Sequence, residues 1–337
     1  MTPHKPSLLG SQVKKVFVTG GAGFIGSHIV DALMAQNYQV SVYDNLSLGK
    51  IDFIKPHFGK KGFQFVQEDL LDLDKLTESV AGHDLVWHLG ANTDIPSGYE
   101  RTDMDLKNCV IATCNMLEAM KRTGVRDMLF PSTGAVYGEL CAENMVNESV
   151  GPLLPVSLYA AGKISCEAFI AAYCAMFGLR SWMFRFGNVL GARMGHGVIY
   201  DFIHKLLRNS KELVILGDGT QEKNYFLVEE CIDGMSYLYR NVRLSDKTPC
   251  DVFNLGTDSV STVTSIAKVV IQEMGLTDVQ VKIAGGLRAW PGDQPKVHFS
   301  VERMKQLGWQ ARHPSDEAVR IAARRMIDSL KAEGVIR

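Results

Sequence analysis

The chain has 337 residues, a formal net charge of −1, 46% hydrophobic residues and 22% charged residues. This length is enough for one large domain or two closely associated ones. The near-neutral charge disfavours nucleic acid and anionic membranes as partners, because both attract strongly basic surfaces. An anionic ligand would have to be held by local backbone amides and a few cations.

The sequence carries no sign of export, membrane insertion or metal binding. Residues 1–14 contain no apolar core of signal-peptide length, and no apolar run approaches the ~18 residues that a membrane helix needs. The seven cysteines form no Cys-x-x-Cys pair, and His196 and His204 have no carboxylate or cysteine at metal-ligand spacing. We therefore expect a cytoplasmic protein with reduced, mostly buried thiols and without a metal site.

The first half of the chain alternates short β-branched runs with longer helical patterns. The runs that predict strands are residues 15–18, 39–43, 63–66, 85–88 and 128–130. The segments that predict helices are residues 24–36, 73–80 and 104–123. Continuous apolar strands that alternate with helices predict a parallel sheet covered on both faces, which is the doubly wound α/β architecture.

The second half is less regular. A helix is predicted over residues 158–177, and strands are predicted at 182–186 and 251–255, with Gly- and Pro-containing loops between the other segments. No long linker or internal repeat separates the two halves. We expect a first domain over residues 12–187, to which a strand at 251–256 returns, and a smaller α/β lobe over residues 188–337.

A glycine-rich turn follows the first predicted strand. The segment KKVFVTGGAGFIG carries Gly20, Gly23 and Gly26 three residues apart, and Gly21 completes a G-x-G-x-x-G pattern. Between a strand and a helix, such a turn lets a pyrophosphate approach the backbone and meet the helix N-terminus. The second strand ends at Asp44, whose carboxylate can bind ribose hydroxyls and would repel a 2′-phosphate. The pattern predicts a dinucleotide site that favours NAD over NADP.

Tyr159 and Lys163 lie one helical turn apart, so their side chains share one face of the predicted helix. A lysine cation beside a phenol favours the phenolate, and we expect the pKa of Tyr159 to fall from about 10 toward neutrality. Such a tyrosine can act as a general base or acid on a substrate hydroxyl. Ser132 and Thr133 follow a predicted strand at the edge where ligands of open parallel sheets bind, so they can contact the same oxygen.

These motifs together resemble the extended short-chain dehydrogenase/reductase superfamily, and within it the nucleotide-sugar epimerases and dehydratases, closest to the UDP-glucose 4-epimerases. The likeness spans nearly the whole chain. The matching segments are VTGGAGFIGSHIVDAL, YDNLS, EDLLD, WHLGAN, STGAVYG, SLYAAGK, FRFGNVLG, HGVIYDFI, LGDGTQEKNYFLVEEC and RAWPGDQPKVHFS, in family order. The resemblance implies a Rossmann-type NAD-binding domain followed by a nucleotide-sugar-binding lobe.

The resemblance also implies roles for individual residues. Tyr159 is the acid/base at the sugar 4-hydroxyl, Lys163 touches the nicotinamide ribose and tunes Tyr159, and Thr133 is their hydroxyl partner. The implied NAD contacts are Gly20, Gly23, Phe24, Ile25, Gly26, Asp44, Asn45, Asp69, Leu70, Leu89, Ala91, Asn108, Ser132, Tyr159, Lys163 and Phe186. The implied substrate contacts are Asn92, Thr93, Thr133, Asn188, Val198, Lys223, Arg288 and Asp293.

Two positions favour one reaction within the family. The 4,6-dehydratases follow the threonine with Asp-Glu and the UDP-glucuronate decarboxylases keep a glutamate there, whereas Gly134 and Ala135 follow Thr133 in this chain. Neither residue can transfer a proton, which disfavours elimination and decarboxylation. The resemblance then implies a 4-epimerase that oxidises C4, lets the 4-keto sugar rotate, and returns the hydride to the opposite face.

Other departures from the family leave the sugar open. Epimerases commonly carry Arg-Asp where this chain has Lys223 and Asn224, and lysine keeps the charge but loses the bidentate fork of arginine. Lys296 and Val297 lie at or next to the family's sugar-size gatekeeper. A small valine would leave room for a 2-acetamido group, and Lys296 or an arginine could meet a uronic acid. The resemblance implies UDP as the nucleotide, and CDP, GDP and other carriers stay open.

Two other functions stay open from the sequence. One is a reductase or dehydrogenase that makes a one-way redox change on a nucleotide-linked sugar. The other is a non-catalytic NAD-binding sensor, which the presence of both Tyr159 and Lys163 disfavours. The helices at 104–123 and 158–177 resemble the pair that forms the family's dimer interface, so we expect a homodimer. His88 ends a strand, and we expect it to be structural.

Overall fold

The computed structural model describes residues 7–143 and 145–336, so residues 1–6 of the segment expected to lack a signal peptide lie outside it. The chain divides into two compact units. Unit 1 comprises Met1–Thr133, Leu158–Arg185 and Ile232–Phe253. Unit 2 comprises Gly134–Ser157, Phe186–Cys231 and Asn254–Arg337. Each unit is therefore built from segments that are far apart in the sequence.

Two segments differ from the expected division, which placed residues 12–187 and the strand at 251–256 in the first domain and the rest of 188–337 in the lobe. The segment that holds Tyr137 belongs to unit 2, where the Tyr137 hydroxyl donates to Asn254 Oδ1 at 2.6 Å. The segment that holds Tyr239 belongs to unit 1, where the Tyr239 hydroxyl donates to Asp127 Oδ2 at 3.0 Å. Both assignments depend on contacts between residues more than 100 positions apart, which local sequence patterns do not reveal.

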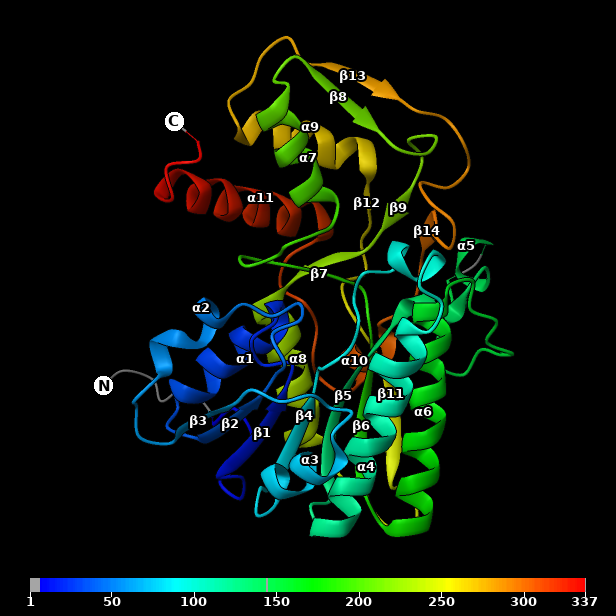
Figure 1. Cartoon of the computed structure of the whole chain (residues 1–337). Coiled ribbons are helices and arrows are strands. Elements are labelled where there is room, and N and C mark those ends of the chain that lie inside the picture. Colours follow the sequence, from blue (N-terminus) through cyan, green and yellow to red (C-terminus); the bar gives the residue numbers. More distant parts are fainter. Residues whose placement is uncertain (1–6, 144, 337) are drawn as a thin grey trace. The chain divides into compact units, whose positions relative to one another are not determined.

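A seven-stranded sheet lies at the centre of unit 1, in the order β11-β6-β5-β4-β1-β2-β3 (Figure 1). Its strands are β1 (Lys15–Thr19), β2 (Gln39–Tyr43), β3 (Phe63–Val66), β4 (Leu85–His88), β5 (Asp127–Thr133), β6 (Arg180–Phe186) and β11 (Cys250–Leu255), the last two ending in unit 2. All neighbouring pairs from β3 to β5 are parallel. The predicted doubly wound parallel sheet and each of its predicted strands are confirmed.

The predicted helices of unit 1 are also present. They are α1 (Phe24–Met34), α3 (Leu73–Val80), α4 (Ala112–Thr123) and α6 (Leu158–Phe177), with the short helices α2 (Ile51–Ile54), η1 (Lys55–His57) and η2 (Pro96–Tyr99). The helix predicted over 104–123 differs, because it begins with the π-helical segment η3 (Leu106–Ile111). The helix predicted to reach residue 36 ends at Met34, shortly before Asn37 adopts a left-handed φ of 63°.

Helix α4 contacts both α3 and α6, and α6 also packs on β5 (Figure 1). Their apolar faces and the sheet bury one continuous core. Its largest members are Phe17, Tyr43, Leu76, Met116, Leu117, Met120, Met128, Phe130, Ile170 and Met183. Burial of each such side chain contributes on the order of 1.5–3 kcal/mol. The apolar residues from which these strands and helices were predicted therefore also stabilise their packing.

Helix α6 is the one helix of the described chain that is long and apolar enough to cross a membrane, by length and composition only. The expectation concerned an uninterrupted apolar stretch, and two charged residues interrupt the apolar residues of this helix. The helix carries them, Lys163 and Glu167, in buried positions and contributes Cys166 and Ile170 to the core of unit 1. Buried, paired ionisable groups of this kind suit a core helix that packs against polar partners.

Unit 2 contains three small sheets. They consist of β7 (Asn188–Leu190) with β10 (Tyr225–Leu227), of β12 (Ser261–Thr262), β9 (Glu222–Lys223) and β14 (Lys296–Val297), and of β8 (Glu212–Ile215) with β13 (Gln280–Ile283). Its helices are η4 (Gly134–Tyr137), α5 (Leu140–Glu143), α7 (Val198–Arg208), α9 (Val263–Glu273), α10 (Glu302–Gln306) and α11 (Ser315–Ala332), while α8 (Val228–Asn241) is shared between the units. Helices α7, α9 and α11 contact one another around a second apolar core.

Candidate active site

The glycine turn between β1 and α1 has the close packing that its pattern predicts. Gly20 has φ 65°, and a Cβ there would lie 2.8 Å from the backbone nitrogen of Gly90. A Cβ on Gly26 would collide with the carbonyl oxygen of Gly20. These contacts bring the start of α1 directly onto the sheet. The first amide groups of a helix have no partner within it, so those of Phe24 and Ile25 can bind an anionic group.

The ends of β2 and β3 meet beside this turn. The buried Asp44 carboxylate accepts hydrogen bonds from Ala22 N at 2.9 Å and from Leu46 N at 2.8 Å. Burial raises the pKa of Asp44, and these two hydrogen bonds oppose the rise. Asn45 Nδ2 donates to Asp69 Oδ2 at 2.8 Å. Three of the predicted NAD contacts, Asp44, Asn45 and Asp69, are thus brought together at the carboxyl edge of the sheet.

The end of β4 is fixed against β1. Gly90 N donates to Thr19 Oγ1 at 3.0 Å, and His88 Nδ1 is hydrogen-bonded to the same hydroxyl at 2.8 Å. His88 Nε2 is 3.1 Å from Thr113 Oγ1, and burial lowers the pKa of His88 to about 3. A neutral, fully paired imidazole supports the expectation that His88 is structural. Leu70 reaches this strand end, because a Cβ on Gly90 would lie 2.5 Å from Leu70 Cδ1.

Further along, Leu89 N donates to Thr19 O at 3.2 Å, and the half-buried Ala91 packs against the unit 1 core. The buried Asn92 donates through Nδ2 to Asp105 Oδ1 at 3.1 Å. Asp105 was not identified from the sequence, since its carboxylate joins the site only through the tertiary packing of the η3 region. Asn108 lies half-buried on η3, and Thr93 follows Asn92 in the loop after β4.

The acid–base set forms at the end of β5. Lys163 is 4% exposed, and its Nζ donates to Pro131 O at 2.8 Å and lies 4.8 Å from the centre of the Phe130 ring. Tyr159 shares the same face of α6 and is hydrogen-bonded to Thr133. Unit 1 therefore brings together the three residues predicted to form the acid–base set, which are Thr133, Tyr159 and Lys163.

The expected direction of the pKa of Tyr159 is wrong. Burial raises this pKa above its usual value, and the Lys163 cation and the hydrogen bond from Thr133 oppose the rise without reversing it. Cys109 and Asp105, in their ionised forms, add to the rise. Burial lowers the pKa of Lys163, but the ionised forms of Cys109, Tyr159 and other acidic neighbours favour the cation and raise this pKa to a net increase. Lys163 is therefore cationic, and desolvation is what the spacing argument left out.

Ser132, a predicted NAD contact, has its hydroxyl engaged elsewhere. It donates to Glu167 Oε1 at 2.5 Å, and Glu167 is ion-paired with Arg185, with Arg185 Nη2 at 2.7 Å from Glu167 Oε2. All three residues are buried. Glu167 and Arg185 were not predicted from the sequence. The available signal was spacing, because Glu167 follows Lys163 by four residues and so lies on the same helical face.

The predicted substrate-binding cations of unit 2 already have carboxylate partners. Lys223 Nζ lies 2.9 Å from Asp293 Oδ1, and Arg288 Nη2 lies 2.5 Å from Glu139 Oε1. Arg288 Nη1 also donates to the carbonyl oxygen of Asp293 at 2.5 Å. Lys223, Arg288 and Asp293 are therefore neighbours in unit 2, although the sequence separates Lys223 from the other two by more than 60 residues. The sequence did not identify Glu139.

The other predicted contacts of unit 2 lie on regular elements. Asn188 Nδ2 donates to Asn224 O at 3.2 Å, between β7 and the start of β10. Val198 begins α7 and packs partly buried against the unit 2 core. The buried Phe186 ring packs edge-on against Phe226, with ring centres 6.4 Å apart. Each of these side chains therefore has a packing role in unit 2 in addition to the predicted ligand contact.

The departures from the family pattern have structural consequences within unit 2. The Asn224 amide donates to Thr257 O at 3.4 Å, a bond that aspartate could not make. Val297 is 7% exposed and pairs in register with Lys223. A Cβ on Gly134 would lie 2.7 Å from the Phe299 ring, so an acidic side chain here would have to displace that ring.

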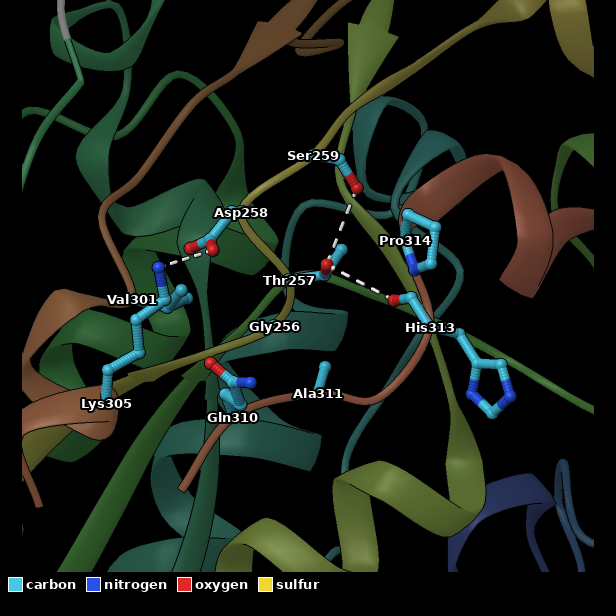
Figure 2. A pocket seen from close by; sticks show the side chains of 10 residues that line it. All are labelled: Gly256, Thr257, Asp258, Ser259, Val301, Lys305, Gln310, Ala311, His313 and Pro314. Carbon is cyan, nitrogen blue, oxygen red and sulfur yellow. Dashed lines mark hydrogen bonds and ion pairs between the residues drawn. The ribbon is translucent and has the colours of Figure 1, made fainter. Parts of the chain in front are cut away.

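One pocket of unit 2, about 230 Å³ in volume, contains none of the predicted site residues (Figure 2). In it Thr257 Oγ1 donates to His313 O at 3.3 Å and lies 3.5 Å from Ser259 Oγ. Its cation, Lys305, is ion-paired with Asp258 at 2.5 Å. Three of its polar side chains, Thr257, Asp258 and Lys305, are therefore already paired within the pocket, and we assign it no ligand.

Comparisons with known proteins show which family the chain resembles over most of its length. Residues 16–256 match the model of the NAD dependent epimerase/dehydratase family. A Methanocaldococcus jannaschii protein assigned as a UDP-glucose 4-epimerase is 30% identical over 88% of this chain and 92% of its own length. UDP-glucuronic acid decarboxylase 4 of Arabidopsis thaliana is 31% identical over 90% of this chain and 67% of its own length. The crystal structure of the Thermus thermophilus UDP-glucose 4-epimerase with NAD is 28% identical, with a TM-score of 0.80 over 92% of this chain and 98% of that one.

Proposed function

The chain belongs to the NAD-dependent epimerase/dehydratase family of the short-chain dehydrogenase/reductase superfamily, and from that premise we propose that it is a nucleotide-sugar 4-epimerase acting on a UDP-sugar. Its cofactor is NAD. The residues present fit this cofactor. Gly20 and Gly26 carry no side chain, so a pyrophosphate can approach the backbone of the turn, and the Asp44 carboxylate can accept hydrogen bonds from ribose hydroxyls. NAD bound there supplies a group that accepts a hydride from the sugar and returns it.

The observation that carries the proposal is the pair of residues directly after Thr133. Glycine and alanine occupy positions 134 and 135, where the resemblance places the acids of dehydratases and the glutamate of decarboxylases. Gly134 is enclosed by the Phe299 ring, so a carboxylate cannot be accommodated without displacing that ring. Without an acid here, the Thr133–Tyr159–Lys163 set supports proton transfer at a hydroxyl and offers no partner for elimination.

The chain's own residues account for the proton movements. Burial raises the pKa of Tyr159, and the Lys163 cation favours the ionised form that takes the proton of the sugar 4-hydroxyl, while Thr133 hydrogen-bonds the same oxygen. Lys163 stabilises the phenolate by charge and is itself held by Pro131 O. After the 4-keto sugar has rotated so that C4 presents its opposite face, Tyr159 returns the proton to the 4-oxygen. Retention of the nucleotide by unit 2 keeps the sugar bound while its ring turns.

The substrate class has weaker support. The two relatives and the solved structure are all named for UDP-sugars, which favours UDP as the nucleotide. Lys223 and Arg288 are the cations that would meet the diphosphate, each by exchanging its present carboxylate for phosphate. The small Val297 favours a pocket that admits a 2-acetamido group as well as a 2-hydroxyl.

We also propose that the enzyme is a homodimer through η3, α4 and α6. The support for it is a set of large apolar side chains that η3 and α6 leave exposed. They are Leu106, Ile111, Leu158, Phe169, Met176 and Phe177. Light scattering after size exclusion would test this, with Phe169→Glu expected to give a monomer. A wild-type monomer at micromolar concentration would contradict it.

The activity is tested by incubating the purified enzyme with UDP-glucose, UDP-galactose and their 2-acetamido and uronic forms, and by following the sugars by NMR. We expect 4-epimers of at least one pair to reach equilibrium without net formation of NADH. Loss of water, release of carbon dioxide, or NADH formed in proportion to product would contradict the proposal and indicate a dehydratase, a decarboxylase or a one-way dehydrogenase.

A further inference from the structure

Two residues of α6 that lie one helical turn apart hold the end of β5. Lys163 Nζ donates to Pro131 O at 2.8 Å, and Glu167 Oε1 accepts from the Ser132 hydroxyl at 2.5 Å. These contacts fix two consecutive residues of β5, and the next residue is Thr133. The position of Thr133 relative to the Lys163 side chain therefore depends on both contacts.

Glu167 is in turn fixed by Arg185 of β6. Arg185 Nε donates to Glu167 Oε1 at 3.1 Å, and Arg185 Nη2 lies 2.7 Å from Oε2, so the pairing is bidentate. Both side chains are 6% exposed. A buried carboxylate cannot leave its counter-ion without a large desolvation cost, so Glu167 has essentially one position available. Ser132 donates to an oxygen that is already fixed.

We propose that Glu167 is a positioning residue for the acid–base set, which, with Arg185 as its counter-ion and Ser132 as its contact, fixes the end of β5 so that Thr133 and Lys163 face Tyr159. Glu167 acts through other residues and has no assigned contact with substrate or NAD. The proposal rests on the proposed function only in its effect on turnover, because the positioning of the set does not depend on which sugar reacts.

The charged and titratable groups around Tyr159 decide what loosening this contact would do. They are Lys163 on the same helix, Thr133 on β5, and Cys109 and Asp105 from the η3 region. Lys163 is the cation that opposes the rise in the pKa of Tyr159. If the end of β5 shifts, Pro131 O no longer holds Lys163 in place. The pKa of Tyr159 should then rise further, and the acidic limb of the pH–rate profile should move to higher pH.

The chain contains a matched control at the other end of the same two strands. Arg180 of β6 pairs with Asp127 of β5, with Nε at 2.7 Å and Nη2 at 2.6 Å from Asp127 Oδ1. This pair joins β5 to β6 directly through arginine and a carboxylate, whereas Glu167 does so from α6, and it lies at the amino ends of the strands. Asp127→Asn should therefore lower the melting temperature without affecting Tyr159.

The test compares Ser132→Ala, Ser132→Thr, Glu167→Gln and Asp127→Asn in the full chain. The first readout is a pH titration of tyrosinate absorbance, which needs no substrate. The titration of the same variant with Tyr159→Phe added is subtracted, so the difference reports on Tyr159 alone. The second is the pH dependence of turnover. Ser132→Ala leaves the Glu167–Arg185 pair intact, so it reports on positioning even if Glu167→Gln fails to fold.

We expect Ser132→Ala and Glu167→Gln to raise the pKa of Tyr159 and to lower kcat by about tenfold at neutral pH with KM little changed. Ser132→Thr, which keeps the hydroxyl, should restore the wild-type titration, and Asp127→Asn should match wild type in both readouts. The proposal is overturned if Ser132→Ala titrates like wild type, or if Asp127→Asn moves the titration as far. The titration alone decides this, so a chain that failed to epimerise any sugar would still show whether Glu167 positions the set.

Discussion

The two groups of charged side chains assigned to ligand chemistry are held in opposite ways. In unit 1, Lys163 and the side chain of Glu167 are 4% and 6% exposed and are bonded to the end of β5. In unit 2, Lys223 and Arg288 are 20% and 34% exposed and are paired with single carboxylates. Buried charges are held because separating them is costly, whereas partly exposed pairs are weak. The reacting set is therefore rigid. The unit 2 cations are more exposed and can exchange partners more easily, Arg288 most easily because its partner Glu139 is 54% exposed, whereas Asp293, the partner of Lys223, is 2% exposed.

The largest effect should come from removing the reacting hydroxyl of the buried acid–base set in unit 1. Tyr159→Phe deletes the acid/base and leaves the ring to pack, so kcat should fall by about 10³-fold with the fold retained. Steady-state epimerisation measures the rate, and circular dichroism and NAD binding serve as controls. A rate within tenfold of wild type would mean that another group carries the proton.

A smaller effect, on substrate binding, should come from removing one of the partly exposed cations of unit 2. Lys223→Ala removes the cation and leaves the buried Asp293 carboxylate to repel a diphosphate. KM should rise about tenfold while kcat stays near wild type, because uniform binding is lost. Lys223→Arg is the matched control and should keep KM close to wild type. A fall in kcat at unchanged KM would instead place Lys223 with the reacting set.

The smallest effect should be on stability and should come from a buried histidine that takes no part in turnover. The pKa of His88 is lowered to about 3 in the folded chain, against about 6.5 when unfolded. The neutral form is therefore favoured by folding, and this contribution is present above about pH 6.5 and is lost as the pH falls toward 3.

His88→Gln should accordingly show a flatter loss of stability between these pH values than wild type, as measured by urea unfolding. Its stability near neutral pH should be lower, because the contacts with Thr19 and Thr113 change. An identical slope for the two proteins would show that other groups govern acid unfolding.

Local patterns predicted the fold well because the relevant signals are local. Each strand of the sheet is a short apolar run, and the turn at Gly20 needs only glycine spacing and its place between a strand and a helix. The pairing of Tyr159 with Lys163 follows from helical periodicity alone. These features could be predicted because neighbours in sequence are neighbours in space.

The rest depends on tertiary packing. The pKa of Tyr159 was predicted in the wrong direction because its burial cannot be read from residue spacing. The Glu167–Arg185 pair joins a helix to a strand 18 residues later, and Asp105 joins the site only through the η3 region. The two segments that change units are likewise held by contacts that no periodic pattern encodes.

The most direct test of the proposed 4-epimerase uses UDP-glucose, or whichever sugar the panel identifies, carrying deuterium at C4. Transient oxidation at C4 predicts that the epimer keeps the deuterium at C4, with none lost to solvent and none of the solvent's hydrogen entering the ring. Deuterium lost from C4, or solvent hydrogen incorporated at C5, would contradict epimerisation by the Thr133–Tyr159–Lys163 set.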